Sequence, residues 1–132
     1  MQRRSRYRDS LQETLRRAPG PLSAAEVHRR LCDTGVGLAT VYRLLNEGLE
    51  QGALVGVDLP GGPRRFEPAG LPRHHHFECR SCRQVTSVMG QPSGLERLAP
   101  EGFTVERQEV ILFGRCPDCA EKAQEKVQDA HL

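Results

Sequence analysis

The sequence has no tryptophan, two tyrosines and four phenylalanines among its 132 residues. So few aromatic side chains predict modest hydrophobic cores, and small cores often need an additional staple such as a structural metal ion. No stretch approaches about 18 consecutive apolar residues, so we expect no membrane partner. No apolar signal-peptide core follows Met1, which predicts a cytoplasmic protein.

The sequence has little net charge, with a formal value of +2, but its two halves differ in charge. Residues 1–73 carry 12 Lys or Arg against 8 Asp or Glu, a balance of +4. Residues 74–132 carry 7 against 9, a balance of −2. A basic first half predicts a polyanionic partner for that half. The length allows one ordinary domain or two small ones.

Four of the five cysteines form two Cys-x-x-Cys pairs, Cys79 with Cys82 and Cys116 with Cys119. The two-residue gap lets one tight turn present both sulfurs to one ion, so the four thiolates predict a structural Zn²⁺ site. A redox role for either pair requires a helix start inside a βαβ unit, a context that the pattern lacks. Cys32, the fifth, follows an apolar helical stripe and is expected to be a small buried hydrophobe.

Two helices joined by a glycine-containing turn are predicted in the first half, after an arginine-rich helix that ends at Pro19. Ser23 and Glu26 have the spacing of a capping box, which starts one helix. Thr40 is expected to cap the next helix, which ends near Gln51. This pattern is compatible with a helix-turn-helix that docks in the DNA major groove, and equally with an ordinary small helical bundle.

Thr40, Tyr42 and Arg43 lie on the polar face of that second helix, close to its start. The early residues of a recognition helix are those that meet base edges and phosphates. We therefore expect these three residues to contact DNA.

A β-hairpin is predicted over residues 53–67, because apolar alternation surrounds a Pro-Gly-Gly-Pro turn. A hairpin after a helix-turn-helix is a wing, and Arg64 and Arg65 follow its tip. These two arginines are expected to reach a backbone phosphate. A charged, solvated edge strand is the alternative interpretation.

Two prolines and a glycine in residues 68–72 predict a hinge at about 68–73. This hinge divides the chain into a DNA-binding domain, residues 1–71, and a second domain, residues 74–132. Beyond it we expect a short helix near 95–98, strands at 103–105 and 110–113, and a final helix after the second cysteine pair.

Three consecutive histidines follow the hinge. On a strand, the period of two places His74 and His76 on one face and His75 on the other. A His-x-His pair on one face is a two-point grip for a divalent metal, and imidazole alone does not select among Zn²⁺, Fe²⁺ and Ni²⁺. Ordinary polar histidines are the alternative.

The runs at residues 37–43, 65–67, 74–82 and 113–119 together resemble the ferric uptake regulator family, from about Arg8 to Cys119. The resemblance implies an α+β fold: an N-terminal winged helix-turn-helix DNA-binding domain, then a small α/β dimerisation domain with a four-cysteine zinc site. It implies a homodimeric, metal-dependent transcriptional repressor that binds palindromic double-stranded DNA. Neither enzymatic activity nor a small organic substrate is expected.

Residue by residue, the resemblance implies a structural zinc site, a DNA contact, a regulatory metal site and a possible additional one. The structural zinc ligands are the four paired cysteines, and Arg8 matches a backbone-contacting arginine of the first helix. Glu67, His74 and His76 match ligands of a regulatory site for Zn²⁺, Fe²⁺ or Mn²⁺. A possible additional site retains only His75 and Glu96.

Three departures from the family pattern leave the regulatory site open. Pro21 stands where iron and peroxide sensors have a histidine, and Ser87 where peroxide sensors have an aspartate. Ala69 or its neighbours stand where zinc sensors often have a hinge cysteine. Water or Asp58 is a possible fourth ligand. The alternative functions are an iron-loaded peroxide sensor of the same family and, in a different class, a small zinc-dependent hydrolase.

Overall fold

The computed structural model describes residues 2–130 and divides into two compact units, Met1–Pro72 and Arg73–Leu132. We call them the first unit and the second unit. Within the described chain, no helix is long and apolar enough to cross a membrane.

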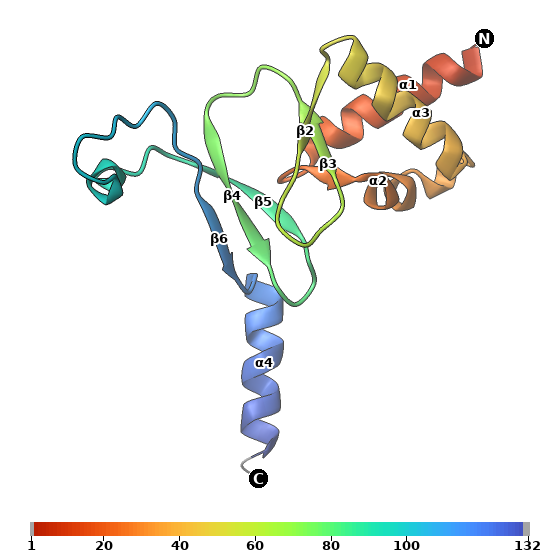
Figure 1. Ribbon diagram of the computed structural model, residues 1–132. Helices are drawn as coiled ribbons and strands as arrows, with labels where there is room; N and C mark the ends of the chain where they lie inside the picture. Colours follow the sequence, from red (N-terminus) through yellow and green to blue (C-terminus); the bar gives the residue numbers. More distant parts are fainter. Residues whose placement is uncertain (1, 131–132) are drawn as a thin grey trace. The chain divides into compact units, whose positions relative to one another are not determined.

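Three helices and a small antiparallel sheet make up the first unit (Figure 1). The strand order is β1-β3-β2, and the β2–β3 hairpin follows α3, as in a winged helix. We call residues 54–68 the wing. The elements are α1 (Gln2–Arg17), β1 (Leu22–Ser23), α2 (Ala24–Arg30), the 3₁₀ turn η1 (Cys32–Thr34), α3 (Leu38–Glu50), β2 (Leu54–Val57) and β3 (Arg65–Pro68).

The capping box that starts α2 is present. Glu26 N–H donates to Ser23 Oγ at 3.2 Å, and Ser23 N–H donates to Glu26 Oε1 at 2.9 Å. The expected cap of α3 was wrong, because Gly37 is the N-cap residue and Thr40 lies inside the first turn. Glycine is tolerated at an N-cap almost as well as threonine, so the helix begins three residues earlier than expected.

The core of the first unit is formed by the apolar stripes of α1, α2 and α3 against the sheet. Gly48 is required where α3 crosses β2, since a Cβ there would lie 2.6 Å from Leu54 Cδ1. The buried members are Leu11, Leu15, Leu22, Ala24, Val27, Leu31, Val36, Val41, Leu44, Leu45, Leu54 and Phe66. With this face of α3 inside, its polar face is left in solvent.

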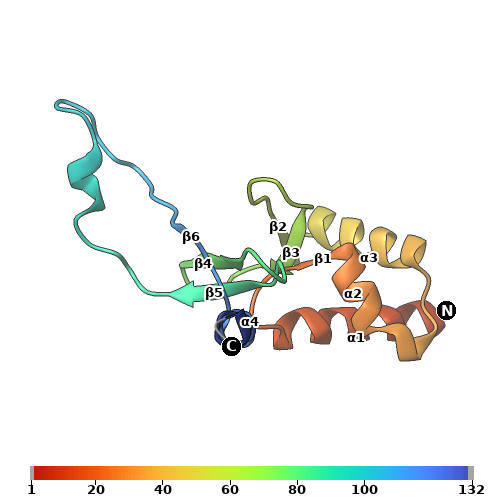
Figure 2. The same cartoon turned by 90° about the horizontal axis from the view of Figure 1, so that it is seen from below.

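A three-stranded sheet of order β5-β4-β6 and one long helix build the second unit. β5 is antiparallel to β4, whereas β6 is parallel to it. Figure 2 shows the chain between β5 and β6 making a long excursion away from the sheet. The elements are β4 (His74–Cys79), β5 (Val85–Met89), the 3₁₀ turn η2 (Leu95–Leu98), β6 (Ile111–Gly114) and α4 (Pro117–Ala130).

The strand expected at residues 103–105 does not form. This segment is irregular, and Phe103 is 71% exposed. A β-rich sequence becomes a strand only when another strand offers hydrogen bonds, and none in the described chain pairs with it.

Candidate metal centre and nucleic-acid interface

The four paired cysteines meet because β4 and β6 are parallel neighbours. Cys79 is the last residue of β4, in register with Gly114 at the end of β6, and the second pair follows β6 directly. One sulfur from each cysteine lies within 4.8 Å of all the others, and Cys82 Sγ is 3.9 Å from Cys116 Sγ. A tetrahedral Zn²⁺ with Zn–S bonds of about 2.3 Å separates its sulfurs by about 3.8 Å. The cluster fits that ion.

The electrostatics of the sulfur cluster also favour a cation. Burial opposes ionisation of Cys79, but backbone N–H groups of Cys82, Cys116 and Ser81 donate to its sulfur and lower its pKa to about 6. Contact with Cys116 and then Cys79 raises the pKa of Cys119 to about 12, since a second negative charge there is repelled. Only a bound cation lets all four become thiolates together.

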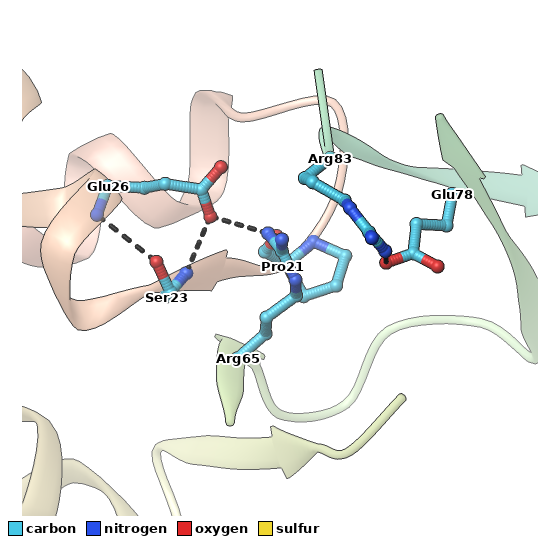
Figure 3. A network of polar contacts seen from close by, with 6 residues as sticks. All are labelled: Pro21, Ser23, Glu26, Arg65, Glu78 and Arg83. Atoms are coloured by element: carbon cyan, nitrogen blue, oxygen red, sulfur yellow. Dashed lines mark hydrogen bonds and ion pairs between the residues drawn. The ribbon is translucent and has the colours of Figure 1, made fainter. Parts of the chain in front are cut away.

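A buried carboxylate, which the sequence did not indicate as functional, braces the first cysteine turn. Glu78 is 2% exposed, and one of its oxygens lies 3.3 Å from Arg80 Nη1. Its other oxygen lies 3.5 Å from Arg83 Nη1 (Figure 3). Arg80 also lies over the ring of Phe113, at 5.5 Å. Both arginines belong to the turn around Cys82, so their ion pairs hold that turn against β4, and the contact of Arg80 with Phe113 adds a tie to β6.

His74 and His76 form a pair within the second unit. The centroids of the two imidazole rings are 4.9 Å apart, and the rings meet edge to face. This arrangement follows from their alternation on β4, where side chains two residues apart share a face. The register partners of His76 are Ser87 of β5 and Ile111 of β6.

His75 has a different role on the opposite side of β4. It is 6% exposed, and its Nδ1 accepts a hydrogen bond from Val110 N–H at 3.0 Å. An imidazole that accepts at Nδ1 carries its proton on Nε2, which is then not a metal-binding lone pair. Glu96 is exposed on η2, and neither residue joins a metal-binding group in the described chain. This hydrogen bond therefore argues against a metal site formed by His75 and Glu96.

Two carboxylates named in the sequence lie in the first unit. Glu67 is on β3 and only 6% exposed. Asp58 accepts hydrogen bonds on both of its oxygens from Arg64, at 3.0 Å each. Asp58 is thus paired with Arg64, and its role as a fourth metal ligand stays a prediction.

The start of α3 presents polar side chains to solvent. Tyr42 is 50% exposed and Arg43 is exposed, while Thr40 is half-buried. Arg8 of α1 approaches the same helix, with its Nη2 3.6 Å from Glu47 Oε2. Arg8 keeps 41% of its side chain exposed, so it is held in place yet accessible.

Arg65 is not at the surface. It is 4% exposed, donates to Glu26 Oε1 at 2.5 Å and donates to the Pro21 carbonyl at 3.4 Å (Figure 3). A buried guanidinium needs such partners, and here it ties β3 to the first turn of α2. This burial corrects the expectation that Arg65 contacts a phosphate. Arg64 precedes β3 and is exposed, whereas residues 65–67 of the strand are all buried.

Cys32 also differs from expectation. It is exposed at the start of η1, in the first unit, with its thiol 3.8 Å from an oxygen of Asp33. The apolar stripe of α2 ends at Leu31, and the turn that follows carries the next side chain into solvent.

A winged helix followed by a small sheet unit with a four-thiolate centre and paired imidazoles defines a class: metal-dependent DNA-binding regulators. Comparison with known proteins agrees. The model of the ferric uptake regulator family matches residues 2–113. The chain belongs to the ferric uptake regulator family.

Individual relatives show the same relationship. The chain is 32% identical over 107 residues to the ferric uptake regulation protein of Escherichia coli strain K12, covering 76% of this chain and 72% of that protein. The solved structure of the Vibrio cholerae ferric uptake regulator is 27% identical, with a TM-score of 0.64 over 88% of this chain and 90% of that one. The ferric uptake regulator from Pseudomonas aeruginosa with manganese is 29% identical, with a TM-score of 0.53 over 84% and 87%.

Family membership fixes the general function. Members of this family are transcription regulators and not enzymes, so the chain is a metal-responsive, DNA-binding transcriptional regulator. The hydrolase alternative is thereby excluded.

Proposed function

We propose that the protein is a homodimeric repressor whose operator binding is switched by a divalent ion held by Glu67, His74 and His76. The observation that carries this proposal is the pairing of His74 and His76 on β4, with rings 4.9 Å apart. A buried carboxylate and two imidazoles form a donor set suited to Zn²⁺, Fe²⁺ or Mn²⁺.

The placement of these ligands explains how binding would regulate. Glu67 belongs to the first unit and the two histidines to the second, on either side of residues 68–73. When bound, the ion would fix the orientation of one unit relative to the other. Two recognition helices of a dimer engage a palindrome when they are about one helical turn, roughly 34–36 Å, apart. A coupling of about 1–3 kcal/mol then changes DNA affinity by roughly 5- to 150-fold.

The DNA contacts proposed are Tyr42 and Arg43 of α3, Thr40 beside them, and Arg8 of α1. Tyr42 and Arg43 are exposed in the first half of α3, the second helix of the helix-turn-helix. Arg8 supplies a backbone phosphate contact, which positions the protein without reading sequence.

Dimerisation is assigned to the second unit. Its surface carries large apolar side chains that a monomer would leave in water, and β6 is an edge strand of the sheet. These exposed residues are Met89, Leu98, Phe103, Val105, Leu112 and Phe113. A second copy covering them would form a homodimer, whose two-fold axis matches a palindromic operator.

The four-cysteine cluster is proposed to hold Zn²⁺ permanently, as a structural ion separate from the regulatory one. Among residues 73–123, whose side chains are described, few apolar residues are buried. Cys79 and Val85 are the fully buried examples. A sheet with so small a core gains much of its stability from a metal.

The His74→Ala variant tests the switch. We expect it to retain one Zn²⁺ per chain and to lose most metal-dependent binding to DNA from upstream of its own gene. Zn²⁺, Mn²⁺ and Fe²⁺ are titrated separately while DNA binding is followed by fluorescence anisotropy, which also identifies the sensed metal. His28→Ala is the matched control, because His28 is a half-buried histidine of α2 outside the site. Metal-dependent affinity unchanged in His74→Ala would refute the switch.

The peroxide-sensing alternative predicts a different chemical result. Exposure of the Fe²⁺-loaded protein to hydrogen peroxide would add oxygen to His74 or His76 and abolish DNA binding. Mass spectrometry of the treated protein separates this outcome from reversible metal sensing.

A further inference from the structure

The wing contains one exposed arginine, Arg64, and that arginine is already bound. Its Nε donates to Asp58 Oδ1 and its Nη2 donates to Asp58 Oδ2, each at 3.0 Å. Asp58 follows β2 and Arg64 precedes β3, so the pair closes the hairpin below its Pro-Gly-Gly-Pro tip. A side-on, two-bond pair of this kind has the strongest geometry available to an arginine and a carboxylate.

The side chain of Arg64 packs against the backbone of β2 at Gly56. A Cβ on Gly56 would lie 3.4 Å from Arg64 Cδ and 3.4 Å from Nε, so the side chain lies close over the strand. A Cβ at that position would be in van der Waals contact with the guanidinium arm. The hydrogen bonds from Arg64 also hold the pKa of Asp58 below its usual range, so the aspartate is anionic at neutral pH.

We propose that Asp58 is a built-in brake on the wing, competing with DNA phosphate for Arg64. This inference rests on the proposed DNA-binding function. With Arg65 buried against Glu26, Arg64 is the one arginine of residues 54–68 left for a phosphate. Paired with Asp58 it adds no net charge to the wing, and a phosphate that approaches it also approaches the carboxylate.

The size of the effect follows from the exposure of the pair. Arg64 is 56% and Asp58 64% exposed, and such solvent-exposed ion pairs are weak. Competition with phosphate is therefore close to balanced. Removing the carboxylate should tighten binding roughly 1.5- to 5-fold at low salt. It should also steepen the logarithmic salt dependence by about 0.9 for the one phosphate newly neutralised.

The biological consequence is a lower affinity for DNA in general. Non-specific binding is almost entirely electrostatic, whereas operator binding also uses base contacts from α3. A neutralised wing therefore weakens non-specific binding proportionally more, which keeps DNA binding dependent on the correct dimer geometry.

The test compares Asp58→Asn with the intact protein on a random-sequence 30-base-pair duplex, by fluorescence anisotropy at several salt concentrations. Glu50→Gln is the matched control, since Glu50 is an exposed carboxylate at the end of α3 and its removal changes net charge equally. We expect Asp58→Asn to bind more tightly than Glu50→Gln. Zinc content and circular dichroism establish that each variant is folded.

A double-mutant cycle with Arg64→Ala decides whether the gain passes through that arginine. The proposal requires the gain from Asp58→Asn to disappear in the Arg64→Ala background. An equal gain in both backgrounds would mean a general charge effect, and weaker binding by Asp58→Asn would mean that Asp58 supports the contact. Either result overturns the brake. The random duplex requires neither operator nor added regulatory metal, so failure of the proposed metal switch would be seen separately.

Discussion

Cys119 and Cys32 are the same residue type in opposite surroundings. Cys119 lies in the four-sulfur cluster of the second unit, whereas Cys32 is exposed in the first unit. We expect Cys119→Ser to lose its Zn²⁺ and to unfold the second unit, because structural zinc contributes on the order of 10 kcal/mol. Zinc content by elemental analysis and circular dichroism measure both effects.

Cys32→Ser is the control for that substitution, and it should keep both its zinc and its fold. Retention of a full complement of zinc by Cys119→Ser would contradict a four-thiolate site. Loss of zinc from Cys32→Ser would show that the ion lies elsewhere.

The ionisation of the cluster gives zinc binding a defined pH dependence. Without metal, Cys119 has a pKa of about 12 and is protonated at neutral pH, so binding must displace its proton. Cys79, with a pKa of about 6, is already a thiolate at pH 7.5 but takes up a proton below pH 6. Zinc affinity should therefore fall as pH decreases, and fall more steeply below about pH 6. Competition with a chromophoric chelator between pH 5.5 and 8 measures it; an affinity independent of pH would contradict the assignment.

His75 gives a third prediction at the scale of a residue. His75→Ala leaves Val110 N–H without its acceptor, which should cost about 1–3 kcal/mol of unfolding free energy in the second unit. His75→Asn restores an acceptor at a similar position and should recover much of it. Metal content should be unchanged in both variants; loss of one metal ion per chain would instead identify His75 as a ligand.

At the scale of secondary-structure elements, Arg65 and Arg43 separate stability from recognition. Arg65→Ala removes the only charged partner described for Glu26, which joins β3 to α2, and should reduce the unfolding free energy by about 3 kcal/mol. Arg43→Ala removes an exposed side chain of α3 and should leave stability within about 0.5 kcal/mol. Urea unfolding measures this, and anisotropy below the unfolding transition should show DNA binding lost in Arg43→Ala alone. The reverse pattern would return Arg65 to the DNA interface.

Local signals predicted the elements where the deciding interaction is local. Ser23 and Glu26 are three residues apart and satisfy each other, so the start of α2 was readable from the sequence. The strand expected at 103–105 failed because strand formation needs a distant partner. Arg65 was misjudged for a related reason: its partners, Glu26 and the Pro21 carbonyl, are 39 and 44 residues away.

At the scale of the whole molecule, the two metal sites differ in what the sequence can establish. The cysteine spacing is specific, and the parallel pairing of β4 with β6 gives it a structural cause. The proposed regulatory site would use Glu67 from the first unit and two histidines from the second, so spacing alone suggests its ligands without fixing their arrangement. The resemblance to a family was what suggested that Glu67, His74 and His76 bind one ion. It could not reveal the Asp58–Arg64 pair, which is a feature of this chain's own wing.

The connection between the units offers the last prediction. Arg73 is exposed, and trypsin should cleave the bond between Arg73 and His74 readily in protein that holds only its structural zinc. A regulatory ion on Glu67, His74 and His76 braces residues 68–73 from both ends, so cleavage there should slow at least severalfold when the sensed metal is added. Cleavage after Arg107, in the exposed segment before β6, is the internal reference and should not change. His76→Ala should lose the protection while keeping its zinc. Equal cleavage at Arg73 with and without metal would mean that the ion does not join the units, even if it binds.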